Sequence, residues 1–182
     1  MYSKLFSAST YGIDAFIVEI ETHLDNALPS FSVVGLPDST VKESRDRVTS
    51  AIKNSGFIFP NKRITVNLAP ADIRKEGSAF DLPIALGILS ATGVISSENF
   101  EGKTLALGEL ALEGTLRPIH GTLSIAIKAK ALGYERVLVP TINAKEGALV
   151  DGIDIIPIEN LSEAVDYLNN LIEIPACIVN KS

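Results

Sequence analysis

The amino-acid sequence predicts an α+β domain, and three observations support this prediction. Short β-rich runs, such as residues 15–20 and 64–68, alternate apolar and polar side chains as half-buried strands do. Residues 40–55 and 80–91 instead have the spacing and length of helices. The strands and helices are mixed without strict alternation, which favours a mixed sheet packed with helices.

The first third of the chain is predicted to contain two strands, residues 15–20 and 31–34, followed by a helix. Thr40 and Glu43 have the spacing of a capping box at the start of this helix, and Gly56 is well placed to end it. Four apolar residues share one face of the predicted helix: Val41, Val48, Ala51 and Ile52.

The middle of the chain is predicted to hold a strand at residues 64–68, a loop, and a helix at residues 80–91. Pro83 lies in the first turn of this helix, where a missing N–H is tolerated, and Gly93 follows its end. Because the helix is almost entirely apolar, we expect it to be buried on most sides.

The second half is predicted to alternate between short strands and helices. The expected elements are strands 105–108 and 116–119 around the turn Glu113-Gly114, helix 123–132, strand 136–139, a short helix 143–149, strand 153–158, and helix 161–171 with Asn160 as N-cap. We expect one domain over residues 1–171. Residues 172–182 lack periodicity and are predicted to be a linker to a further domain.

Composition excludes several classes of protein. The 182 residues are 46% hydrophobic and 21% charged, which is typical of a globular domain with its own core. The single Cys177 cannot form a disulfide within the chain, and with only His23 and His120 a Cys/His zinc site is not expected. Neither a signal peptide nor a membrane-spanning stretch is visible, so the predicted location is cytoplasmic.

The net charge of −6 is unevenly distributed. Residues 42–76 contain eight basic and four acidic residues, whereas the rest of the chain contains eight basic and eighteen acidic ones. Such asymmetry indicates either a face that binds an anion or a solvated helix with two loops. Lys42, Arg45 and Lys53 are expected on the exposed side of the first helix.

Two short motifs resemble ligand sites. Gly102-Lys103-Thr104 is similar to the end of a phosphate loop, but Ser97 stands where the first glycine belongs, and the motif precedes a strand instead of a helix. Asp72, Glu76 and Asp81 could hold a divalent cation, although Arg74 and Lys75 in the same loop favour local ion pairs. The prediction is that this segment holds no cofactor and no metal.

Three stretches together resemble a known family: residues 30–91, residues 105–121 (LALGELALEGTLRPIHG) and residues 126–140 (AIKAKALGYERVLVP). They are similar to the N-terminal domain of the ComM/YifB family, the magnesium-chelatase-like AAA+ proteins. The resemblance implies a Lon-protease-like fold, of the ribosomal protein S-five domain-two and GHMP-kinase type. It also implies a following AAA+ module that binds ATP and Mg²⁺.

The likeness to Lon proteases can be tested at two positions. Those enzymes use a Ser nucleophile in K-D-G-P-S-A-G and a Lys base in P-I-G-G-L-K, and hydrolysis needs both. In register, Ala79 replaces the nucleophile and Leu123 replaces the base, while Ser78 lies one residue early. The resemblance therefore implies a Lon-like domain without the catalytic dyad.

The resemblance implies a non-catalytic domain of a hexameric, ATP-driven DNA helicase that acts in branch migration during natural transformation and homologous recombination. In this role the domain helps to assemble the ring and to guide single-stranded or branched DNA. Phosphate contacts without base readout are expected from six residues: Arg45, Arg47, Lys62, Arg63, Arg74 and Lys75. Two alternatives remain, a ring scaffold that does not touch DNA and a serine peptidase that uses Ser78.

Overall fold

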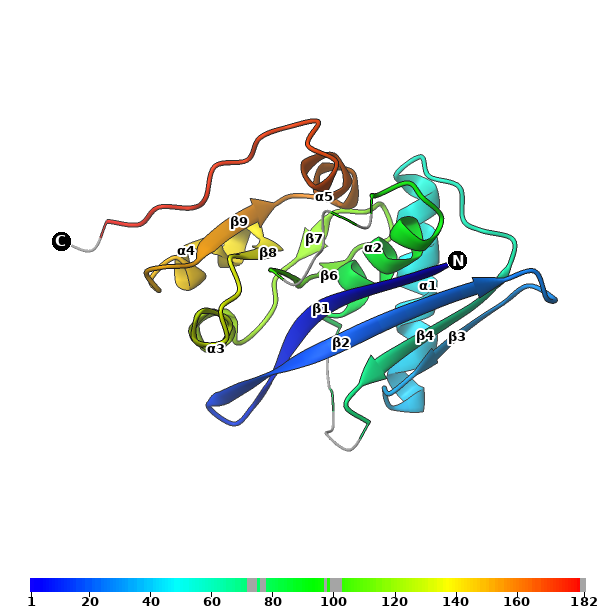
Figure 1. Ribbon diagram of the computed structural model, residues 1–182, viewed down its shortest axis with the longest axis horizontal. Coiled ribbons are helices and arrows are strands. Elements are labelled where there is room, and N and C mark those ends of the chain that lie inside the picture. Colours follow the sequence, from blue (N-terminus) through cyan, green and yellow to red (C-terminus); the bar gives the residue numbers. More distant parts are fainter. Residues whose placement is uncertain (72–74, 76–77, 97, 99–102, 181–182) are drawn as a thin grey trace.

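The computed structural model describes residues 1–71, 75, 78–96, 98 and 103–180. Its centre is a seven-stranded mixed sheet with the strand order β3-β4-β2-β1-β5-β8-β9 (Figure 1). The strands are β1 (Tyr2–Tyr11), β2 (Asp14–Asp25), β3 (Ser30–Val34), β4 (Arg63–Ala69), β5 (Thr104–Ala106), β8 (Arg136–Pro140) and β9 (Asp154–Ile158). β2 is antiparallel to β1 and β4, and the other neighbours are parallel. The prediction of a mixed sheet packed with helices is confirmed.

Helices cover the two faces of the sheet unequally. On one face, α1 (Asp38–Asn54), α2 (Asp81–Ala91) and α5 (Leu161–Leu168) form the larger hydrophobic core (Figure 1). On the other, α3 (Thr122–Ala131) and α4 (Ala144–Gly147), which follows the short turn η2 (Thr141–Asn143), cover a smaller core. A second sheet pairs β6 (Glu109–Leu110) with β7 (Leu116–Arg117). Among the described residues, no helix is both long and apolar enough to cross a membrane.

The predicted helices are present, with shifted ends. All eleven residues of α2 are buried, as its apolar sequence predicts, and Gly93 follows it with φ +85°. The capping box expected at Thr40 is wrong, because α1 begins two residues earlier and the Thr40 hydroxyl donates to the Pro37 carbonyl oxygen. Asn160 does cap α5, since its Oδ1 accepts from the Glu163 N–H at 2.9 Å.

β1 is the largest element that the sequence pattern did not predict, although it lies in the middle of the sheet. Its core-facing positions include Ser3 and Ser7, which are 4% and 0% exposed. The Ser3 hydroxyl donates to the Gly87 carbonyl oxygen and the Ser7 hydroxyl to that of Ala106, both at 2.7 Å. Serines in a core hide the apolar alternation by which a strand is recognised.

The turn at Glu113-Gly114 was correctly predicted, but the strand that precedes it in the hairpin is β6 and not the predicted strand 105–108. Gly114 has φ +99° and closes the small β6–β7 hairpin, whereas β5 belongs to the main sheet. The predicted strand at residues 105–108 therefore ends early, and the chain forms β6 before it turns.

The segment after α5 has no helix or strand through residue 180, yet it contacts the domain. Ile174 and Ala176 pack against the larger core, and the Cys177 N–H donates to the Ile155 carbonyl oxygen of β9 at 2.8 Å. A linker over residues 172–182 remains a prediction, and residues 181–182 lie outside the described part.

Candidate functional site

The helices α1 and α2 meet at the buried carboxylate of Asp81, whose side chain is 1% exposed. Its two oxygens accept hydrogen bonds from Arg47 Nε at 2.6 Å and Nη2 at 3.2 Å. They also accept from Ser44 Oγ at 2.8 Å and from the Leu110 N–H at 3.1 Å. This network joins α1, α2 and β6 around one charge.

The pKa values of both charged members of this network are raised, but for different reasons. Burial of the Asp81 carboxyl raises its pKa, and the bonds from Arg47, Leu110 and Ser44 oppose this shift. The hydrogen bond to Asp81 raises the pKa of the Arg47 guanidinium. Because Arg47 is held by Asp81, its guanidinium is engaged within the chain, and its contact with a phosphate stays a prediction.

Arg45 follows Ser44 on α1 but faces the edge of the sheet instead of the buried network. Its Nη1 donates to the Phe31 carbonyl oxygen of the edge strand β3 at 2.9 Å. Among the described residues, no carboxylate pairs with Arg45. Its charge is therefore not neutralised, and it stays a candidate phosphate contact.

Lys62 and Arg63 lie at the start of β4, beside the turn that follows β2. Lys62 Nζ donates to the neutral Oδ1 of Asn26 and keeps its full charge. Arg63 instead pairs with Asp25, with Nη2 at 2.6 Å from Oδ2, and this bond lowers the pKa of that carboxyl. Lys62 is therefore better suited than Arg63 to attract a phosphate.

The remaining two predicted contacts fall in the loop after β4. Lys75 is 1% exposed and its ammonium donates to the Pro70 carbonyl oxygen. A side chain so deeply buried does not favour contact with a phosphate at the surface, and the contact at Lys75 stays a prediction. Arg74 lies outside the described residues.

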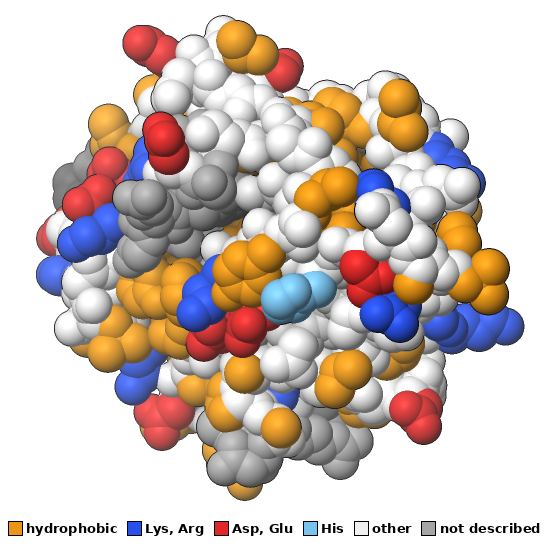
Figure 2. Space-filling view, turned by 45° about the vertical axis from the view of Figure 1, so that its right-hand side comes forward, with side chains coloured by type: hydrophobic (Ala, Val, Ile, Leu, Met, Phe, Trp, Pro, Cys, Tyr) orange, Lys and Arg blue, Asp and Glu red, His pale blue; other side chains and the backbone are white. Residues whose placement is uncertain are grey.

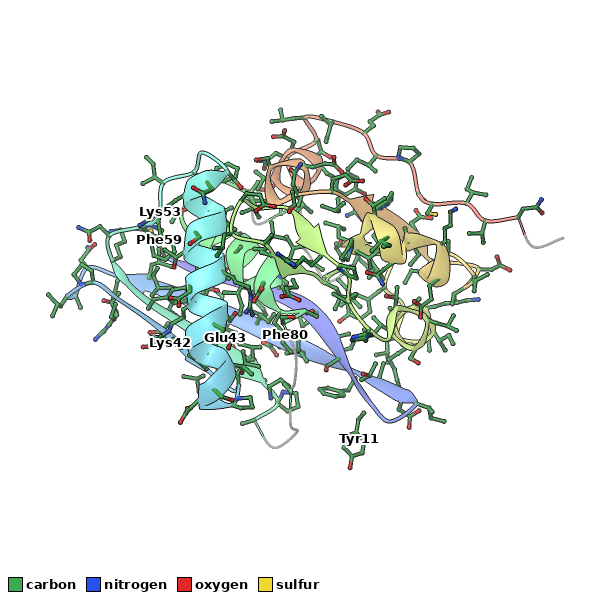
Figure 3. The ribbon with its side chains drawn as sticks, turned by 180° about the vertical axis from the view of Figure 1, so that it is seen from behind. Tyr11, Lys42, Glu43, Lys53, Phe59 and Phe80 are labelled. Atoms are coloured by element: carbon green, nitrogen blue, oxygen red, sulfur yellow. The ribbon has the colours of Figure 1, made fainter. Side chains whose placement is uncertain are left out.

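Lys42 and Lys53 are exposed near the two ends of α1, as predicted (Figure 3). Eleven residues of helix separate them by about 16 Å. On the face seen in Figure 2, basic side chains are interspersed with acidic and apolar ones. The basic residues of this segment that pair with no described carboxylate are a sparse set: Lys42, Arg45, Lys53 and Lys62.

Of the three carboxylates considered as cation ligands, Asp81 alone lies among the described residues. Asp72 and Glu76 lie outside the described residues, and Asp81 is already bonded to a guanidinium. Within the described part of the chain, acidic, His and Cys side chains form no cluster suited to a metal ion. For the phosphate-loop motif, Thr104 opens β5 with a buried hydroxyl, as a turn before a strand predicts; Ser97 and Gly102 lie outside the described residues.

Ala79, the residue predicted to stand in place of the Lon nucleophile, lies at a cavity of about 360 Å³. Ala79 lines it with its methyl group, and beside it the Ser78 hydroxyl donates to Glu109 Oε2 at 2.7 Å. Leu123 lies in the first turn of α3, where its N–H donates to Glu146 Oε1. The hydrogen-bond partner of the Ser78 hydroxyl is thus a carboxylate and not an amine.

Glu109 and the Ser44–Asp81 bond were missed by the sequence analysis. Ser44 and Arg47 lie three residues apart on one helix, and Asp81 opens an otherwise apolar helix. A contact between Asp81 and these two side chains could therefore have been suspected. Nothing in the sequence around Glu109 indicates that it meets Ser78, which is 31 residues away.

Comparisons with known proteins find relatives of this chain. Residues 20–143 match the family described as subunit ChlI of Mg-chelatase. Competence protein ComM of Haemophilus influenzae is 43% identical over 171 residues, covering 94% of this chain and 33% of that protein. YifB of Salmonella typhimurium is 50% identical over 139 residues, covering 76% and 27%.

A more distant likeness extends to Lon protease 2 of Bacillus subtilis, which is 30% identical over 132 residues, covering 71% of this chain and 23% of that enzyme. The chain spans about a third of the length of the curated relatives ComM and YifB. By its match to the ChlI family and its likeness to these two relatives, the chain is a member of the ComM/YifB family of magnesium-chelatase-like proteins.

Proposed function

We propose that this chain is the non-catalytic, Lon-like domain of a ComM/YifB-type AAA+ DNA helicase. In this proposal the whole protein drives branch migration during natural transformation and homologous recombination. The domain helps to assemble a hexameric ring and guides single-stranded or branched DNA into it. ATP and Mg²⁺ are bound by an AAA+ module elsewhere in the protein.

One observation supports a non-catalytic role above the others. The cavity at the start of α2 is lined by the Ala79 methyl group where a Lon protease has its nucleophile. Leu123, at the position of the general base, carries no amine. The Ser78 hydroxyl is bonded to a carboxylate and not to a Lys amine, so a serine peptidase at Ser78 would lack the base that Lon proteases use. A domain that keeps the fold without this chemistry is suited to binding.

The basic residues that support DNA guidance are Lys42, Arg45, Lys53 and Lys62. They bear charges that no described carboxylate neutralises, and they follow α1 and the neighbouring end of β4. So few contacts predict weak, non-specific binding by a monomer, with Kd about 10⁻⁴–10⁻⁶ M. A closed ring multiplies the contacts and strengthens binding through avidity.

The test is charge reversal in the full-length protein. Arg45→Glu with Lys62→Glu should weaken binding to branched DNA and flatten its salt dependence, by about 0.9 in the slope for each phosphate that the variant no longer binds. Lys42→Glu with Lys53→Glu should do the same without disturbing the Arg45 bond to Phe31. The matched control reverses Lys130 and Lys145, two exposed lysines on α3 and α4.

The second candidate function is a ring scaffold that never touches DNA. Its support is that Arg47, Arg63 and Lys75 are all engaged within the chain, which carries a net charge of −6. Unchanged DNA affinity and slope in both double variants, with the ring intact, would select this scaffold. Loss of the ring itself would place these residues at a subunit interface.

A further inference from the structure

The cavity beside Ala79 is bounded by four separate parts of the chain. Its walls come from the end of β1, the start of α2, β6, and the loop that leads into α3. Its volume of about 360 Å³ falls within the range of ligand sites, roughly 300–1,000 Å³. Described residues thus enclose a space large enough for a ligand.

One wall of the cavity is a strand edge that is left open. β1 pairs with β2 along its whole length, but with β5 at a single position, Phe6 with Leu105. β5 ends at Ala106, so residues 8–11 of β1 extend past it, and Ala8, Ser9 and Thr10 line the cavity.

The register shows which groups on this edge are available. Gly12 and Ile13 form the two-residue turn of the β1–β2 hairpin, so Tyr11 and Asp14 are the hydrogen-bonded pair that closes it. Hydrogen-bonded and non-bonded pairs alternate along antiparallel strands, so the N–H and C=O of Thr10 point away from β2. In the described part of the chain, no backbone group forms a hydrogen bond with the N–H or the C=O of Thr10.

An open strand edge of this kind accepts an extended chain as an additional strand. The other walls suit the side chains of such a chain. Ala79, Ile119 and Ile125 are apolar, and Ser78 with Glu109 forms one polar spot.

The charge of the cavity indicates what kind of chain fits. Glu109 is the acidic group in its wall, His120 lies exposed at its rim, and Arg47 behind Glu109 is bonded to Asp81. A phosphate would be repelled by Glu109, whereas a Lys or Arg side chain would be attracted to it.

We propose that this cavity binds an extended basic segment of a partner protein, which adds as a strand to the end of β1. The segment is held and not cleaved. This binding site goes beyond the proposed function, because it gives the domain a protein ligand separate from the DNA path on α1 and β4.

The probe is a pair of fluorescein-labelled decapeptide pools with randomised β-prone residues, one carrying Lys and the other Glu at its central positions. Fluorescence anisotropy should show at least tenfold tighter binding of the Lys pool. At saturation, hydrogen exchange followed by NMR should show the Thr10 amide slowed at least tenfold, because the peptide then occupies it.

Variants of Glu109 test the charge. Glu109→Gln keeps a hydrogen-bond acceptor for Ser78 and should abolish the preference for the Lys pool, and Glu109→Lys should reverse it. Glu113→Lys makes the same charge change on the neighbouring exposed turn and should leave binding within twofold. Binding of branched DNA by full-length Glu109→Gln should be unchanged, which separates this site from the DNA path.

Several results would overturn the proposal. In the anisotropy measurement, these are a failure of both pools to bind or equal binding of the two pools. In the exchange measurement, it is an unchanged rate at the Thr10 amide. Equal effects of Glu109→Lys and Glu113→Lys, or displacement of the bound peptide by single-stranded DNA, would also overturn it.

Discussion

At the scale of single residues, Asp81 connects the interior of the domain to its candidate site. Its carboxylate binds Arg47 and Ser44 of α1 and the N–H of Leu110, next to Glu109. Removing one member of a buried ion pair leaves the other charge without compensation, which is costlier than never having the pair. This network should therefore be intolerant of single substitutions.

Asp81→Ala should lower the free energy of unfolding by about 3–5 kcal/mol, since it removes the buried partner of the Arg47 guanidinium and leaves it only the exposed Glu43, 3.7 Å away. Urea denaturation measures this difference. Asp46→Ala removes an exposed carboxylate from α1 and should stay within about 0.5 kcal/mol of the wild type. Equal effects of the two substitutions would show that the buried pair is not the cause.

The exposed pair of Asp25 and Arg63 predicts a small pH dependence of stability. Its hydrogen bond to Arg63 lowers the pKa of Asp25 in the folded protein below the ordinary value of 3.8. The unfolded state therefore binds more protons as pH falls, and the stabilisation present above pH 4 is lost below it.

Asp25→Asn should accordingly be slightly less stable than the wild type at neutral pH, and the gap should close at acidic pH. Urea unfolding between pH 3 and pH 7 tests this. A gap that widens on acidification would contradict the assigned direction of the pKa shift.

At the scale of elements, a close approach between backbones constrains how the connection from β3 to α1 packs against β4. Gly35, between β3 and α1, has φ +102°, and a Cβ there would lie 2.3 Å from the Leu68 carbonyl oxygen of β4. Gly133, after α3, has φ +87° with open space where its Cβ would be. Substituting each glycine by Ala therefore separates two contributions to the free energy of unfolding. Gly133 reports the left-handed backbone conformation alone, and Gly35 reports this conformation together with a steric clash.

Gly133→Ala should cost about 1–2 kcal/mol, for the left-handed conformation alone. Gly35→Ala should cost clearly more, because β3 and α1 must also move away from β4. Thermal and urea denaturation of the two variants make the comparison. If both variants are destabilised equally, the close approach to Leu68 imposes no constraint.

The elements also show how far sequence patterns reach. α2 was predictable because an unbroken apolar run can only be buried, and α5 because Asn160 marks its start. β1 was not, since Ser3 and Ser7 occupy core positions and bond to backbone oxygens that are 84 and 99 residues away. Local periodicity contains no information about such distant partners.

The candidate site was predictable to a similar degree. Ala79 could be placed by resemblance, because the surrounding motif is contiguous in the sequence. The partners of Arg47, Arg63 and Lys75 could not be predicted from the sequence. They depend on how α1 packs on α2, how β4 pairs with β2, and how the loop after β4 folds. Charge is visible in a sequence, whereas its neutralisation is a property of the fold.

At the scale of the whole molecule, motor chemistry is expected in another part of the protein. Lys103 stands before a strand, and the Thr104 hydroxyl is buried, so neither is arranged to hold a nucleotide with its Mg²⁺. The domain is expected to contribute surfaces and not turnover.

The isolated chain should therefore not bind ATP. Isothermal titration calorimetry with Mg²⁺ and ATP should give no heat of binding for residues 1–182. The full-length protein serves as the positive control. Micromolar affinity of the isolated chain would assign a nucleotide site to this domain and contradict the division of roles.

Under the proposed function this domain binds other molecules without cleaving them, and one measurement tests this proposal most directly. The full-length protein with ATP and Mg²⁺ is incubated with an unfolded protein substrate and with a fluorophosphonate probe that labels activated serines. We predict intact substrate and no labelling, because Ala79 and Leu123 supply neither nucleophile nor base. ATP-stimulated degradation or labelling that disappears in Ser78→Ala would contradict it.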